Sequence, residues 1–200
     1  MEVFMDTLYN LVKFLHFMSF VFMTVPLFNL IVVNERALLG VSFNYYADRY
    51  MENIIKHGAY RCYVFQSTVL ITGSLLLLLG PMGIEALWMN WIILAKTILL
   101  IVLMGLLSYV HFKLQPAIES FLAGLDADSQ IPDNLVGQLK PYRIRRKRMA
   151  TICLFLVITV IILGLQIYGA FSPFLNFILI GLAGLFSLKV NKTLIRFGWI

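Results

Sequence analysis

Charged residues are scarce in this sequence of 200 residues, in which Asp, Glu, Lys and Arg make up 13% and hydrophobic residues make up 60%. A soluble domain of this size carries about 25% charged residues and uses them to cover its surface. The shortage of charge therefore excludes an ordinary soluble globular protein and points to a membrane protein.

The apolar residues come in long blocks, and they lack the alternation of apolar and polar positions that membrane-spanning strands require. Each block is long enough for a helix to cross a hydrocarbon core about 30 Å thick at about 1.5 Å per residue. We predict an all-α integral membrane protein with a bundle of five transmembrane helices, at about 8–33, 60–80, 87–112, 149–168 and 173–188. Residues 34–59 and 113–148 are the long cytoplasmic connections of this single domain.

Lysine and arginine are absent from the three segments that five crossings place on one side of the membrane, residues 1–7, 81–86 and 169–172. The segments on the other side hold fourteen of the sixteen basic residues. The positive-inside rule predicts that the N-terminus lies outside and the C-terminus lies in the cytoplasm, in a cell (inner) membrane. The net charge of +6 follows from this topology and from attraction to anionic headgroups, so it does not indicate a nucleic-acid partner.

Several kinds of functional motif are also missing. The predicted spans contain no pair of acids, no nucleophile triad and no phosphate-binding loop, which argues against a hydrolase or transferase. No ring of charged residues lines a helix, which argues against a channel. The two cysteines, Cys62 and Cys153, are predicted in a reducing compartment that disfavours a disulfide. They are either small packing residues or thiol ligands of a metal.

Two ionisable residues lie deep within the predicted spans, where such residues are costly and usually functional. His16 lies about nine residues into the first helix, and Lys96 lies about nine residues into the third. Both helices run inward from the outer face, so both side chains are expected about 13 Å below that face. No span offers Lys96 an acidic partner. Its ammonium therefore needs a propionate, a quinone carbonyl or helix carbonyl groups, unless it snorkels to a lipid phosphate.

A second pair of histidines, His57 and His111, is predicted at the cytoplasmic interface on neighbouring helices. Counted from the external turn, both lie about 35 Å along their helices at about 1.5 Å per residue. Two level imidazoles suit the axial positions of a six-coordinate b-type haem. Arg49, Arg61 and Lys113 are near enough in the sequence to pair with its propionates. The simpler interpretation is that His57 and His111 face lipid or the interface. For His16 it is a histidine bonded to a neighbouring backbone group or to a hydroxyl such as that of Ser74.

These residues favour a membrane protein that binds b-type haem and passes electrons, with a quinone or porphyrinogen as its partner. His16, His57 and His111 would be the metal ligands, and Lys96 would pair with a propionate or polarise the quinone. The sequence leaves open whether the protein is an enzyme.

Two other functions stay open. Copper handling is an alternative because Met18 and Met23 flank His16 and copper(I) prefers soft ligands. A non-catalytic anchor subunit of a larger membrane complex is another, because small and polar positions in the last two helices fit a packing face. Gly181 and Gly184 in the last helix offer close packing to a neighbouring helix.

Three stretches of the sequence carry a family resemblance: FLHFMSFVFM (14–23), LITGSLLLL (70–78) and AKTILLIVLMGLLSYVHFKLQPAI (95–118). They resemble the CopD-like membrane domain. Three features recur in that family. They are a histidine in helix one, a Thr-Gly pair in helix two, and a lysine near the start of a third helix that ends in a polar stretch with proline. The matching positions here are His16, Thr72, Gly73, Lys96 and Pro116.

A more distant resemblance is carried by the segment RYMENIIKHGAYR (49–61). It is similar to the stretch before helix two in the HemJ family of membrane protoporphyrinogen oxidases, which bind b-type haem. Together the resemblances cover about residues 8–118 and imply a redox-active or metal-linked membrane protein. The last two helices have no counterpart in them.

Overall fold

The structure, a computed structural model, describes residues 2–39, 44–125, 131–167, 169 and 172–194, and this part of the chain is helical with no β-strand. Five of its helices are long and apolar enough to cross a membrane. The predicted all-α class and the five long apolar helices are therefore confirmed, whereas the orientation of the termini stays a prediction. Parts of the predicted connections and of the basic tail lie outside the described residues, at 40–43, 126–130 and 195–200.

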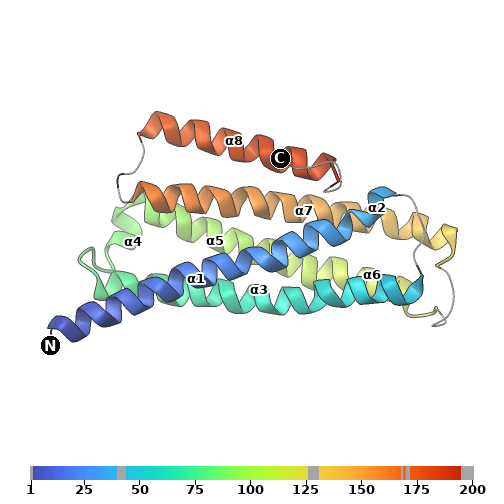
Figure 1. Cartoon of the computed structure of the whole chain (residues 1–200), viewed down its shortest axis with the longest axis horizontal. Helices are drawn as coiled ribbons and strands as arrows, with labels where there is room; N and C mark the ends of the chain where they lie inside the picture. Colours follow the sequence, from blue (N-terminus) through green and yellow to red (C-terminus); the bar gives the residue numbers. More distant parts are fainter. Residues whose placement is uncertain (1, 40–43, 126–130, 168, 170–171, 195–200) are drawn as a thin grey trace.

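Four helices form the core of a bundle and a fifth lies outside it. In chain order the elements are α1 (Glu2–Asn34), α2 (Arg36–Leu39), α3 (Tyr45–Leu79), α4 (Ala86–Met89), α5 (Trp91–Tyr109), the π-helical turn η1 (Val110–Leu114), α6 (Gln115–Leu122), α7 (Asp133–Gln166) and α8 (Pro173–Lys192). Helices α1, α3, α5 and α7 run side by side along the long axis, and α8 packs against α7 (Figure 1).

The two ends of the bundle differ in charge. The charge-poor end holds the start of α1, α4 and the connection from α7 to α8, and the charge-rich end holds α2, the start of α3, α6 and the start of α7 (Figure 1). Helices α1, α3 and α7 have 33, 35 and 34 residues. At about 1.5 Å per residue they are longer than a hydrocarbon core about 30 Å thick. Much of the predicted connections 34–59 and 113–148 is therefore helical.

Polar residues mark where helices begin. The side chains of Asn44, Asn90 and Ser172 accept backbone N–H groups in the first turns of α3, α5 and α8, at 2.8, 3.0 and 3.3 Å. Each satisfies a donor that the first helical turn leaves without an intrahelical partner. Gly83, in the turn after α3, has a φ of 70°, a conformation that glycine adopts without steric cost.

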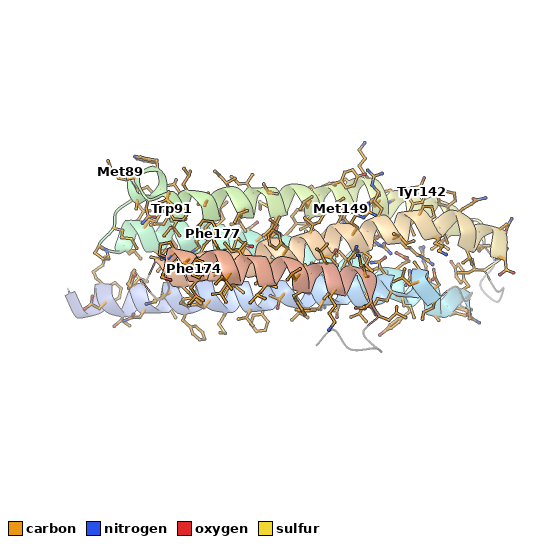
Figure 2. The ribbon with its side chains drawn as sticks, turned by 90° about the horizontal axis from the view of Figure 1, so that it is seen from above. Met89, Trp91, Tyr142, Met149, Phe174 and Phe177 are labelled. Carbon is orange, nitrogen blue, oxygen red and sulfur yellow. The ribbon has the colours of Figure 1, made fainter. Side chains whose placement is uncertain are left out.

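Large apolar side chains cover the outside of the bundle. Phe174 and Phe177 on α8 are 75% and 77% exposed, and Met89 and Trp91 are 78% and 66% exposed (Figure 2). Soluble monomers rarely expose apolar surface on this scale. The same side chains suit contact with lipid, and aromatic residues are typical of the membrane interface. The surface of the bundle therefore supports a multi-pass membrane protein.

Helix α3 approaches α1 closely at Pro26. Pro26 lies inside α1, and a Cβ placed on Gly58 of α3 would lie 3.5 Å from the Cβ of Pro26. Met23, Ile31 and Leu103 are almost completely buried in the same core. The glycine at position 58 thus lets α3 approach α1 closely at its proline.

Candidate functional site

One level of the four-helix core gathers polar side chains and glycines from all four helices. We term it the polar layer, and it consists of His16 on α1, Thr72 and Gly73 on α3, Lys96 on α5 and Gly164 on α7. His16 Nδ1 and Thr72 Oγ1 are 2.9 Å apart. A Cβ placed on Gly73 would lie 3.3 Å from His16 Cε1, and one on Gly164 would lie 3.5 Å from Lys96 Nζ. The two glycines thus make room for the imidazole and the ammonium.

The hydrogen bonds of the polar layer determine the tautomer of His16. Thr72 donates its one hydroxyl proton to the carbonyl oxygen of Thr68 at 2.6 Å, so its oxygen acts as an acceptor toward the imidazole. His16 Nδ1 therefore carries the proton and donates it to Thr72, while Nε2 carries the lone pair. A ring held at one nitrogen with the other available is the arrangement of metal-ligating histidines.

Lys96 is the unpaired member of the polar layer. Its ammonium has no hydrogen-bond or ion-pair partner in the part of the chain that the structure describes, although it lies close enough to His16 for an electrostatic interaction. Charged groups within a membrane span are costly unless they pair or face a polar cavity. The layer therefore presents a donor, Lys96 Nζ, that the described residues leave unpaired, near an imidazole that is bonded to Thr72 and to the backbone of Val69.

The structure brings His16 and Lys96 together, the two residues that the sequence places at one depth. It adds Thr72 and Gly73, which are positions of the family resemblance. Gly164 is a member that sequence reasoning missed. The only sequence signal for it is its small size in an otherwise bulky helix, because no ionisable residue marks that part of α7.

His57 does not share a site with His16. It is exposed on α3, and its Nδ1 lies 2.8 Å from the carbonyl oxygen of Asn53 in the same helix. His57 and Thr72, which contacts His16, are about 22 Å apart along α3 at 1.5 Å per residue. One haem iron therefore cannot be ligated by both His16 and His57.

His111 lies in η1 among aromatic rings. Its ring centroid is 5.1 Å from that of Tyr60 and 6.0 Å from that of Tyr63, and its Nδ1 is buried with no hydrogen-bond partner among the described residues. The hydrogen bond of His57 uses only Nδ1, so the prediction that His57 and His111 are axial ligands stays a prediction. The basic residues predicted to pair with propionates are exposed or half-buried: Arg49, Arg61 and Lys113.

The π-helical turn η1 changes the register of the third long helix. The backbone N–H of Gln115 donates to the carbonyl oxygen of Val110, five residues earlier. Pro116 follows directly and has no N–H with which to continue an α-helical ladder, which favours the wider turn. The turn leaves Gln115 only 3% exposed, so this amide enters the interior at the charge-rich end.

A second polar assembly lies at the charge-rich end of the core. We term it the arginine cluster, and its buried charged members are Arg36 on α2, Asp48 and Glu52 on α3, and Arg143 and Arg146 on α7. Arg146 holds Glu52 with two hydrogen bonds of 2.8 and 3.0 Å, and Arg36 also donates to Glu52. Asp48 pairs with Arg36 at 3.2 Å and with Arg143 at 2.5 Å.

Two amides extend the arginine cluster to further helices. Asn34 at the end of α1 accepts from Arg146 Nε at 2.8 Å. Gln115 on α6 accepts from Arg146 Nη1 at 2.6 Å and donates to Glu52 at 3.3 Å. The cluster thus joins α1, α2, α3, α6 and α7, and each of its charged side chains has an opposite charge within reach. Sequence reasoning missed it, because the pairs form between segments far apart in the chain.

A small cavity lies on the bundle axis between the arginine cluster and the polar layer. We term it the axial cavity; its volume is about 50 Å³, and its lining is mainly apolar side chains of α1, α3, α5 and α7. Cys62 and Cys153, both free thiols, line it. Pockets for whole ligands usually have about 300–1,000 Å³, so this cavity alone is too small for a haem. No group of three or more His, Cys, Asp or Glu side chains in the described ranges is arranged to hold a metal ion.

Comparison of the chain with protein-family models, with curated proteins and with solved structures found no match. The resemblance to the CopD-like and HemJ families therefore stays a prediction from short motifs.

Proposed function

We propose that this chain is a membrane redox protein that binds a lipid-soluble quinone at the polar layer. The observation that carries the proposal is the half-buried Lys96 ammonium, which interacts electrostatically with His16 and has no hydrogen-bond or ion-pair partner among the described residues. A quinone carbonyl oxygen would accept a hydrogen bond from Lys96, and a hydroxyl of the reduced form would donate to His16 Nε2. An adjacent donor and acceptor suit a ligand that alternates between carbonyl and hydroxyl forms.

A b-type haem is the second candidate, and the tautomer of His16 favours it. Thr72 holds Nδ1–H and leaves the Nε2 lone pair available for an axial bond, as in other iron-ligating histidines. Lys96 would then pair with a propionate. When bound, a haem supplies one-electron transfer. The polar layer offers one axial histidine of the three that the sequence suggested.

We also propose the orientation predicted from the basic residues, with the charge-rich end in the cytoplasm and the membrane being the cell (inner) membrane. Exposed basic side chains on the first half of α7 support it, among them Lys140, Arg145 and Arg148. Such residues are enriched in cytoplasmic segments and attract anionic headgroups.

Replacing Lys96 by methionine tests the quinone proposal. The chain, in nanodiscs of quinone-free phosphatidylcholine, is titrated with a short-chain benzoquinone by calorimetry. Lys96→Met is expected to weaken binding about tenfold or more, because a hydrogen bond to a charged group contributes about 1.5–3 kcal/mol and 1.4 kcal/mol is a factor of ten. The matched control is Lys189→Met on α8, an exposed lysine whose loss is expected to leave the affinity unchanged.

The absorbance spectrum of the same samples separates the two candidates. Haem would be favoured if the unaltered chain shows a Soret band and does not bind quinone, and if the Soret band is lost in His16→Ala. Neither quinone binding nor a Soret band, in protein from cells supplied with haem, would contradict both candidates.

A further inference from the structure

The axial cavity contains an unused hydrogen-bond acceptor. Gln66 lines the cavity at the end that faces the polar layer, and it is only 3% exposed. Its Nε2 donates weakly to Cys62 Sγ at 3.6 Å, while its Oε1 is buried with no partner in the described part of the chain. A buried acceptor without a donor is unfavourable. The position is therefore suited to a ligand that brings a donor.

The rest of the lining suits a hydrocarbon chain. Along α3 the cavity extends from Ile55 to Gln66, about 16 Å at 1.5 Å per residue, and the small residues Gly58 and Ala59 lie between them. A volume of about 50 Å³ spread over such a length fits a slender chain better than a ring system.

Water is a poorer occupant of the same space. A buried water typically makes about three hydrogen bonds, and Gln66 is the one amide or charged side chain among the described lining residues. The thiols of Cys62 and Cys153 are weak hydrogen-bonding groups. An apolar ligand with a single donor at one end matches this lining more closely.

The polar layer begins just beyond Gln66. Gln66 and Thr72 lie about 9 Å apart along α3 at 1.5 Å per residue. A ligand whose chain occupies the axial cavity would carry its head past Gln66 toward the level of Thr72 on α3. Its chain would follow the axial cavity toward the arginine cluster.

We propose that the site holds the reduced form of the quinone, a quinol, with its alkyl or isoprenoid chain in the axial cavity and one ring hydroxyl donating to Gln66 Oε1. This inference rests on the proposed function and adds which redox form the site prefers. A quinone carries only acceptors and leaves Gln66 Oε1 unpaired. A quinol carries two hydroxyl donors, one for Gln66 and one for His16 Nε2, and its oxygens still accept from Lys96.

Two matched substitutions test the role of Gln66. Gln66→Met removes the acceptor with little change in volume, and Gln138→Met makes the same change at an exposed position of α7. Each protein, in nanodiscs of synthetic phosphatidylcholine without oxygen, is titrated with a decyl-chain benzoquinol and with the corresponding benzoquinone. The unaltered chain and Gln138→Met are expected to bind the quinol about tenfold more tightly than the quinone. Gln66→Met is expected to lose this preference.

A third variant tests the place of the chain. Ala59→Leu adds a larger side chain to the cavity lining and is expected to weaken binding of the decyl quinol at least tenfold. The same quinol without a decyl chain should bind Ala59→Leu and the unaltered protein equally. Equal losses for both ligands would show that the chain does not occupy the axial cavity.

The outcomes separate this inference from the proposed function. If the unaltered chain binds both redox forms equally, or if Gln66→Met keeps the preference, the inference is wrong. If Lys96→Met still weakens binding about tenfold or more in that case, the proposed function survives. If neither form binds the unaltered chain, both fail. Each variant is first checked for folding by size-exclusion chromatography, and Gln66→Leu replaces Gln66→Met if the latter does not fold.

Discussion

The polar layer and the arginine cluster are two polar assemblies in one four-helix core, but only the arginine cluster supplies its own counter-charges. There, Glu52 and Asp48 each contact arginine side chains from two other helices. In the polar layer, Lys96 has no acidic partner among the described residues. Buried charges that are paired within the chain hold helices together. An unpaired charge within a membrane span is typical of a functional site.

The largest expected effect comes from breaking the arginine cluster. Glu52→Gln would leave three buried guanidinium groups opposite Asp48 alone. Removing one partner of a buried ion pair costs about 3–5 kcal/mol of stability, so we expect a large fall in the thermal unfolding temperature of the protein in detergent, or loss of folded protein.

The matched control for Glu52 is the ion pair at the same end of the bundle that is partly open to solvent. Lys56 Nζ and Glu119 Oε1 are 3.4 Å apart, with side chains 43% and 29% exposed. Such pairs contribute about 0–1 kcal/mol, so Glu119→Gln should change the unfolding temperature little. Equal losses for Glu52→Gln and Glu119→Gln would mean that the cluster is no more important than a surface pair.

An intermediate effect is expected from removing the group that orients His16. Thr72→Val leaves the Nδ1–H of His16 without its hydroxyl acceptor, which costs about 1–3 kcal/mol. The imidazole ¹⁵N chemical shifts should change from one tautomer, with the proton on Nδ1, to a mixture of the two. Thr68→Val, one turn away, removes a hydroxyl that donates only to Val64 of its own helix. If the tautomer is the same in all three proteins, Thr72 does not determine it.

The smallest expected effect concerns the two glycines of the polar layer. Alanine is favoured over glycine inside a helix by about 1 kcal/mol. Gly164→Ala would place its Cβ at an ordinary contact distance of 3.5 Å from Lys96 Nζ, whereas Gly73→Ala would place it at 3.3 Å from His16 Cε1. We expect Gly164→Ala to be neutral or slightly stabilising and Gly73→Ala to be less stable, and thermal unfolding compares them. The opposite order would contradict the described placement of His16.

The sequence predicts the number of long helices well and their ends poorly. Apolar blocks reveal the parts of the helices that contact lipid. The start of α7 is polar, so the sequence predicts a connection there. In the structure it is a helix whose interior face carries Arg146, which donates to Glu52, 94 residues earlier in the chain. A pairing of that range leaves only weak local signs, namely acids four residues apart and arginines three apart on one helical face.

Depth along the helices predicts some neighbours and not others. For His16 and Lys96, counting from the charge-poor end predicts one depth, and in the structure the two side chains interact electrostatically. Reasoning from depth is insufficient for His57 and His111, because depth does not say toward which side a ring points. In addition, η1 shifts the register of the helix from Val110 onward, and an isolated sequence gives little sign of such a turn beyond Pro116.

The arginine cluster also sets an order for biogenesis. Glu52, the acid at the centre of the cluster, is synthesised early, and Arg143, which contacts it, follows 91 residues later. At ribosomal speeds of about 5–20 residues per second, this interval lasts about 5–20 s. During that interval the nascent chain exposes a carboxylate whose later counter-charges have not yet been translated. A transcript truncated before α7 would encode Asp48 and Glu52 without Arg143 and Arg146, which pair with them.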